Sequence, residues 1–306
     1  MSFHIYKDEG KAKLPNYSPN PKLKDTSLYL PSKGLQSAVN VALTLGQPLL
    51  LTGEPGTGKT QLAYHLAEFF GMGKPLVFNT QSNSSARDLF YQYDALGHFQ
   101  ASQTQKTAIS FEDVEARFIR FMALGDAIRH QRKAVVLIDE IDKAPRDLPN
   151  DVLAAIEDLS FDVPEIAKSF ASSNEARPII VMTSNSEKNL PDAFLRRVVY
   201  YHIPFPDHKS LLKIVAKKVD GFSDKALDAV VAHFETIRNG TEVKLRKNPA
   251  TAELIQWASL LHQLDFKAEQ LADLETMSAE NREKLLISYP VLAKNREDLK
   301  ALNDWI

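Results

Sequence analysis

The chain of 306 residues contains no cysteine, so disulfide bonds, thiol nucleophiles and thiolate metal sites are excluded. It also lacks a charge excess, since 37 basic residues stand against 39 acidic ones and the formal net charge is -2. A balanced charge produces no global field that would attract nucleic acid or an anionic membrane. Contact with nucleic acid would therefore depend on a local basic patch, and we expect neither nucleic acid nor membrane among the partners.

Long hydrophobic runs are missing as well. The first 22 residues, MSFHIYKDEGKAKLPNYSPNPK, contain no apolar core of signal-peptide length, and no later run approaches the ~20 apolar residues of a membrane span. The eight histidines show no paired ligand spacing such as H-E-x-x-H, so a zinc site built from protein side chains is not expected. We expect a cytoplasmic protein.

Short apolar runs alternate with amphipathic segments over the first two thirds of the chain. Strands are predicted at the five apolar runs 49–52, 75–80, 133–140, 178–185 and 198–203. Helices are predicted between them at 33–47, 61–70, 111–130 and 148–159, with a small hairpin near 161–166. Continuous apolar strands that alternate with helices favour an α/β fold, in which helices cover both faces of a parallel sheet.

The pattern changes after Pro204 and Pro206, which mark a linker. Beyond them the periodicity is helical throughout, and helices are expected near 207–219, 223–238 and 250–264. The opening residues are rich in Lys, Pro and Asn and are interpreted as an extended arm. The predicted organisation is therefore an arm over 1–32, an α/β domain over 33–206 and a smaller helical part over 207–306.

A glycine-rich loop lies directly between a predicted strand and a predicted helix, in LLLTGEPGTGKTQLA. Gly53-x4-Gly58-Lys59-Thr60 has the spacing of a P-loop, whose backbone N–H groups enclose nucleotide phosphates while the lysine reaches the outer phosphates and the hydroxyl holds Mg²⁺. The alternative is a glycine-rich turn without a ligand. The candidate nucleotide-binding residues are Gly53, Glu54, Pro55, Gly56, Thr57, Gly58, Lys59, Thr60 and Gln61.

Polar side chains end two other predicted strands. In VVLIDE, Asp139 could hold the metal ion through water, and Glu140 could orient or deprotonate an attacking water. Thr60 and Asp139 are thus the candidate metal ligands, although an acidic strand end can also be a plain exposed terminus. In VMTSN, Asn185 could position the attacking water near the γ-phosphate, or could simply be a turn residue.

Three separated segments, GEPGTGKT, VVLIDEIDKAP and TSNSEKNLPDAFLRRVVYYHIPFP, occur in this order. Together they resemble an AAA+ ATPase of the MoxR-like group over about residues 33–265. The resemblance implies a P-loop NTPase fold with strand order 5-1-4-3-2, a small all-helical lid, and a ring, usually hexameric, with ATP at each subunit interface. It also implies that Asp139 and Glu140 are the Walker B pair and that Asn185 is sensor 1.

The resemblance assigns roles to arginines too. Arg197 occupies the position of the arginine in the family's LDRF-type ending and is the first candidate for an arginine finger, with Arg196 as the second. A solvated helix end or a salt bridge within the subunit is the alternative for this pair. The more common MoxR pattern has an arginine after the proline at 249, where this chain has Ala250, so Arg246 is the candidate for sensor 2 against a plain surface charge.

Two further segments, 94–110 and 161–176, occupy the places of the insertions that in MoxR-like proteins face the pore or a partner. They could hold a polypeptide or a partner domain, or they could be loops whose length has no consequence. By resemblance, the partner often bears a von Willebrand factor A domain.

These observations together predict a MoxR-like, chaperone-like ATPase that hydrolyses Mg-ATP at the interfaces of a homo-oligomeric ring and remodels or activates a protein partner. Lys59, Thr60, Asp139 and Glu140 would come from one subunit and Arg197 from the next. One alternative is a nucleic-acid motor or a GTP-using restriction subunit similar to McrB. Another is a nucleotide-gated scaffold with negligible turnover.

Overall fold

A computed structural model describes residues 6, 21–23, 25–104, 108–145, 148–185 and 190–306. Most of the predicted N-terminal arm therefore lies outside the described residues. The chain divides into two compact units. The first, called here the helical unit, contains the described residues of Met1–Leu30, Glu54–Thr57 and Pro204–Ile306, and the second, called the α/β unit, contains those of Pro31–Gly53 and Gly58–Ile203.

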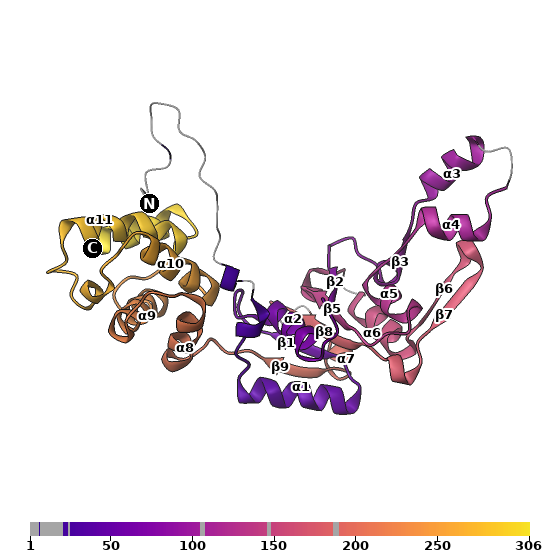
Figure 1. Ribbon diagram of the computed structural model, residues 1–306, viewed down its shortest axis with the longest axis horizontal. Coiled ribbons are helices and arrows are strands. Elements are labelled where there is room, and N and C mark those ends of the chain that lie inside the picture. Colours follow the sequence, from indigo (N-terminus) through magenta and orange to yellow (C-terminus); the bar gives the residue numbers. More distant parts are fainter. Residues whose placement is uncertain (1–5, 7–20, 24, 105–107, 146–147, 186–189) are drawn as a thin grey trace. The chain divides into compact units, whose positions relative to one another are not determined.

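Five parallel strands form the sheet of the α/β unit, in the order β2-β5-β8-β1-β9 (Figure 1). Their bounds are β1 Leu49–Thr52, β2 Leu76–Asn79, β5 Val135–Asp139, β8 Ile179–Thr183 and β9 Val199–His202. When these five strands are numbered along the chain, the order from one edge is 5-1-4-3-2. The strand order implied by the resemblance is therefore confirmed, as is the α/β class predicted from the pattern of strands and helices.

Helices flank this sheet. They are α1 Lys33–Leu45, α2 Lys59–Phe69, α5 Ala123–Arg129, α6 Leu148–Asp158 and the short α7 Asp192–Leu195. Successive residues of the interior strand β5 are all buried up to Ile138, which requires cover on both faces of the sheet. Helix α1 begins after Ser32, whose hydroxyl accepts the Leu35 N–H at 3.2 Å, and ends at Gly46 in the left-handed conformation.

The single helix expected over 111–130 is wrong. The structure has α4 Phe111–Phe118, then strand β4 Ile119–Phe121, and only then α5. Strand β4 pairs antiparallel with β3 Tyr91–Tyr93, and the Met122 N–H donates to the Phe90 carbonyl at 2.8 Å. The same carbonyl oxygen would lie 1.9 Å from a Cβ at position 125, so only glycine allows this approach. Pairing with a distant segment thus overrides local helical periodicity.

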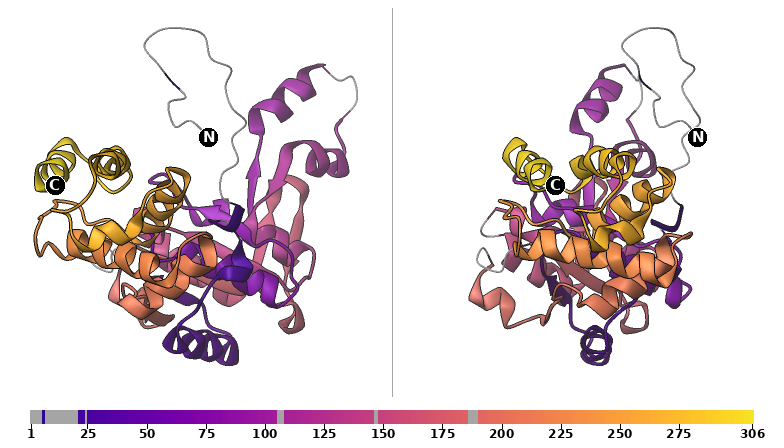
Figure 2. Two further views of the ribbon diagram at one scale, coloured as in Figure 1. Left: turned by 60° about the vertical axis from the view of Figure 1, so that its left-hand side comes forward. Right: turned by 90° about the vertical axis from the view of Figure 1, so that its left-hand side faces the viewer.

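The two predicted insertions have regular structure. Residues 94–110 contain helix α3 Ala95–Thr104, and Figures 1 and 2 place α3 and α4 at the end of the β3–β4 ribbon far from the main sheet. The predicted hairpin is confirmed as β6 Ser160–Val163 paired with β7 Lys168–Ala171. Its Phe161 ring stacks on Phe90 at 4.8 Å and on Phe170 at 5.2 Å between centroids.

The helical unit contains the helices predicted after residue 206. They are α8 His208–Lys218, α9 Asp224–Asn239, α10 Thr251–Gln263, α11 Ala279–Ser288 and α12 Arg296–Trp305. Helix α9 begins after Ser223, which accepts the Ala226 N–H at 3.1 Å, and it ends at Gly240 in the left-handed conformation. Within the described part of the chain, no helix has both the length and the hydrophobicity needed to cross a membrane.

A buried histidine lies in the core of this helical unit. The His233 ring stacks with Trp305 at 4.9 Å, Trp257 at 5.8 Å and Tyr289 at 6.2 Å between centroids. Its Nε2 lies 3.0 Å from the Tyr289 hydroxyl. Because burial penalises the imidazolium, the pKa of His233 is lowered to about 3. The side chain is therefore neutral at physiological pH.

Candidate functional site

The glycine loop follows β1 and ends where α2 begins. Gly53, Gly56 and Gly58 have φ angles of 141°, 78° and 89°, a backbone region that residues with a Cβ rarely adopt. Gly58 is also the N-cap of α2, and no side chain caps the helix there. The start of a helix carries partial positive charge and backbone N–H groups suited to an anion. Both features agree with the predicted phosphate-binding loop, whose role stays a prediction.

Lys59 is the first residue of α2 and is buried. Its ammonium donates to the Gly53 carbonyl at 2.7 Å, so the side chain folds back along the loop from the helix. A buried ammonium is stable only where polar groups surround it. The sequence predicted this lysine as a phosphate ligand, and the structure holds its charge at the glycine loop.

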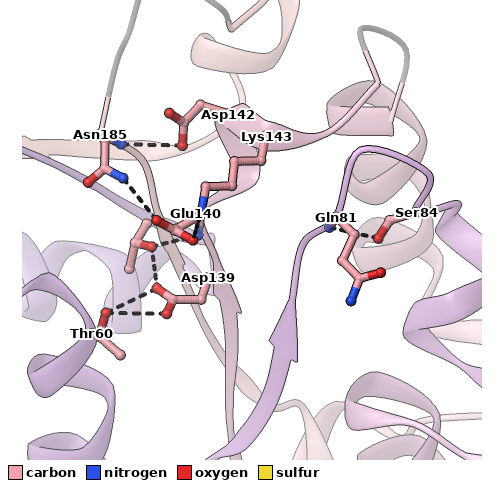
Figure 3. A network of polar contacts seen from close by, with 9 residues as sticks. Thr60, Gln81, Ser84, Asp139, Glu140, Asp142, Lys143 and Asn185 are labelled. Carbon is pink, nitrogen blue, oxygen red and sulfur yellow. Dashed lines mark hydrogen bonds and ion pairs between the residues drawn. The ribbon is translucent and has the colours of Figure 1, made fainter.

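Thr60 and Asp139 lie side by side although 79 positions separate them (Figure 3). The Thr60 hydroxyl donates to the Asp139 carboxylate at 3.1 Å to Oδ1 and 3.4 Å to Oδ2. Thr183, the last residue of β8, donates its hydroxyl to the same Oδ1 at 2.5 Å. Sequence analysis did not single out Thr183, although it precedes Asn185 by two positions at the same strand end.

The oxygen donors at this point suit a magnesium ion. Mg²⁺ prefers oxygen ligands and typically takes one or two from the protein, with phosphate and water completing the octahedron. A threonine hydroxyl and a carboxylate in contact supply such a pair. Thr60 and Asp139 would hold the ion, and the ion would supply positive charge against the phosphates.

Glu140 has an unusual backbone and two side-chain partners. Its φ angle is 56°, which is uncommon for a residue other than glycine and persists only where the surroundings support it. The support comes from the Thr183 hydroxyl, which accepts the Glu140 N–H at 2.9 Å. The carboxylate accepts Asn185 Nδ2 at Oε1 over 3.1 Å and Lys143 Nζ at Oε2 (Figure 3).

Asn185 was predicted to position the attacking water, but its side chain contacts Glu140, the predicted base. The side-chain amide of Asn185 donates to Glu140, and its backbone N–H donates to Asp142 Oδ1 at 3.3 Å. The hydrogen bond to Glu140 also raises the pKa of Lys143. The predicted residues Thr60, Asp139, Glu140 and Asn185 form one connected cluster at the carboxyl end of the sheet.

Residues 48–198 match the sequence family described as an AAA domain of the dynein-related subfamily. The matched segment comprises 151 of the 306 residues and is similar to an AAA domain over that range. Its fold is that of an AAA+ P-loop protein. Two solved structures of RuvB from Thermotoga maritima, each with one substitution, are similar to the chain at 16% identity and a TM-score of 0.43, covering 84% of this chain and 74% of theirs. Among curated proteins, none has a matching sequence.

The two candidates for the arginine finger, Arg196 and Arg197, lie exposed between α7 and β9. The fully buried ring of Phe194 fixes the chain just before them. An exposed position is what an arginine needs to reach a neighbouring subunit. The role of either arginine stays a prediction.

Arg246, the candidate for sensor 2, belongs to the helical unit. Its N–H donates to Asp298 Oδ1 at 2.7 Å, and its exposed guanidinium lies 3.8 Å from Glu297 Oε1. Both contacts are with α12. The sensor role stays a prediction, and the observed partners of Arg246 are carboxylates of its own unit.

Sequence analysis overlooked Arg238, a buried arginine on α9. Its guanidinium carbon lies 3.5 Å from the centre of the Phe205 ring, and it donates to the Pro249 carbonyl at 2.7 Å and to the carboxylate of Glu54. Glu54 clusters with the helical unit. The overlooked signal is a cation on the apolar face of α9, four positions after the buried Phe234.

Proposed function

We propose that the protein is a MoxR-like AAA+ ATPase that hydrolyses ATP with Mg²⁺ and uses the energy to remodel or activate a protein partner. The single observation that carries this proposal is the cluster of Thr60, Asp139, Glu140 and Asn185 at the end of the sheet that bears the glycine loop. The AAA domain match over residues 48–198 supports it independently. A nucleotide switch without turnover would need no carboxylate held in this way.

Lys59 and each residue of the cluster have a role in the proposed reaction. The Lys59 ammonium and the start of α2 would bind the outer phosphates. Thr60 and Asp139 would hold Mg²⁺. Glu140 would accept the proton of the attacking water at a carboxylate oxygen, and Asn185, whose amide bonds Oε1, would keep that carboxylate oriented.

The oligomer and the partner belong to the same proposal. A homo-oligomeric ring, hexameric in the MoxR-like group, would allow Arg197 of one subunit to approach the γ-phosphate in the next, where it stabilises developing negative charge. The partner would be a protein, with a von Willebrand factor A domain as the class that the resemblance indicates. Exposed Leu96 and Phe99 on α3 are suitable contact residues for it.

Steady-state phosphate release tests the proposal. The full chain is incubated with Mg-ATP or Mg-GTP, with and without DNA, beside a Lys59→Ala variant as the control for contaminating activity. We expect ATP-dependent release that exceeds the control and does not respond to DNA. Release confined to GTP or dependent on DNA would favour the motor or restriction alternative, and ATP binding with release no faster than the control would favour a scaffold.

A further inference from the structure

Both oxygens of the Glu140 carboxylate have a donor. Asn185 Nδ2 bonds Oε1 at 3.1 Å, and Lys143 Nζ bonds Oε2 (Figure 3). These three side chains are called here the Glu140 clamp. Lys143 is three residues after Glu140, and the 3-10 turn Ile141–Lys143 returns its side chain to the carboxylate.

The two donors of the clamp differ in how firmly the fold holds them. Asn185 lies two residues after the end of β8, and its backbone N–H donates to Asp142. Lys143 has a flexible four-carbon stem, and its side chain is 55% exposed against 39% for Glu140. Ion pairs this open to water are weak and exchange readily with solvent. Lys143 is therefore the donor that can leave.

The ion pair also acts on the proposed chemistry. An ammonium attracts the Glu140 carboxylate only while the carboxylate is negative. Transfer of a proton to Glu140 removes that attraction, and the bond at Oε2 takes up one of the positions from which the carboxylate could contact water. With Lys143 in place, Glu140 is a restrained base.

We propose that Lys143 is a positioning residue that restrains Glu140 in the resting enzyme and has to leave Oε2 before Glu140 accepts a proton from water. The inference rests on the proposed ATPase function. Asn185 stays on Oε1 and orients the carboxylate after Lys143 has left. Lys143 thereby sets the basal rate of hydrolysis through the availability of the base, and not through the binding of ATP.

The test compares kcat and KM for ATP in Lys143→Met, Lys143→Arg and Lys168→Met. Lys168 is a matched control because it pairs with Glu115 at 44% exposure in the β7 strand. We expect Lys143→Met to raise kcat about two- to fivefold with KM unchanged, because the loss of a weak, solvent-exposed ion pair frees Oε2 of Glu140 for contact with water. Lys143→Arg retains the charge and the donor and should keep the wild-type kcat, as should Lys168→Met.

A second pair of variants separates this inference from the function on which it rests. Glu140→Gln should abolish turnover, and adding Lys143→Met to it should change nothing, because Lys143 acts through Glu140. Unchanged or lower kcat in Lys143→Met, an equal rise in Lys143→Arg, or a rise that persists beside Glu140→Gln would each overturn the role of Lys143. Wild-type turnover in Glu140→Gln alone would instead overturn the assignment of the base, and the clamp with it.

Discussion

Acidification from pH 6.5 to pH 5 is expected to destabilise the helical unit through His233. The folded unit keeps this imidazole neutral, with its pKa lowered to about 3 by burial, whereas the unfolded chain has the ordinary value of about 6.5. Below pH 6.5 the unfolded chain therefore binds a proton that the folded unit does not. The stability that His233 contributes is complete above pH 6.5 and is lost as the pH falls toward 3.

The size of the effect follows from these two pKa values. The free energy of unfolding falls by up to about 1.4 kcal/mol per pH unit, which amounts to about 1.5 kcal/mol between pH 6.5 and pH 5. His208 has the opposite sign, because hydrogen bonds to Glu235 and Asp228 raise its pKa. Its contribution is fully present well below pH 6.5 and is lost as the pH rises, so it adds only a small slope of opposite sign near the upper end of this window.

Tryptophan fluorescence measures this unit selectively. The chain has two tryptophans, and both Trp257 and Trp305 stack with His233. Urea unfolding followed by this signal at several pH values gives the free energy of unfolding of the helical unit.

The comparison variant is His233→Phe combined with Tyr289→Phe. It removes both partners of the buried hydrogen bond together, so no polar group is left unpaired. In the variant, the free energy of unfolding should fall much less between pH 6.5 and pH 5 than it does in the wild type. Equal slopes for wild type and variant would refute the assignment of a neutral buried His233.

Three further outcomes are expected. Lys59→Ala should weaken ATP binding about 10- to 100-fold, the equivalent of one lost charged hydrogen bond, in titrations with a fluorescent nucleotide; an unchanged Kd would contradict the phosphate role. Arg197→Ala should lower kcat by ~10³-fold or more with ATP affinity retained, and phosphate release within tenfold of wild type would rule out the finger. Phe161→Ala should lower the free energy of unfolding by about 3–5 kcal/mol, because Phe161 is buried against Phe90 and Phe170. Urea unfolding followed by far-ultraviolet circular dichroism measures this change, and a loss below ~1 kcal/mol would show that the stacking is dispensable.

The strands of the sheet and the places of several candidate site residues could be predicted from simple sequence patterns. Continuous apolar runs indicated parallel strands, and the carboxyl ends of parallel strands meet at one edge of a sheet. Asp139 and Asn185 follow directly from this rule, since they end β5 and follow β8. The P-loop spacing then placed Thr60 beside the same edge, and the observed contact with Asp139 agrees with it.

The break between α4 and α5 could not be predicted from local pattern. Periodicity reports which face of a helix is apolar, and it contains no information about a partner strand some thirty residues earlier. The pairing of β4 with β3 and the approach of Gly125 to the Phe90 carbonyl decide the outcome. Both contacts exist only in the folded unit.

The side chains that contact Glu140 could not be predicted from the sequence for a related reason. Lys143 reaches the carboxylate because Glu140 adopts a left-handed conformation and a 3-10 turn follows it. The spacing of three positions between a carboxylate and a lysine does not by itself predict a left-handed residue followed by a 3-10 turn at the end of a strand. Thr183 was equally hidden, because its role depends on the register of β8 beside β5.

The most direct test of the central claim is the rate of phosphate release by Glu140→Gln under saturating Mg-ATP, measured together with its affinity for ATP. The matched control is Glu175→Gln, which changes an exposed carboxylate in the segment before β8. If Glu140 is the base, the variant binds ATP with wild-type affinity and releases no phosphate above background, while the control turns over normally. Wild-type phosphate release by Glu140→Gln would contradict the account.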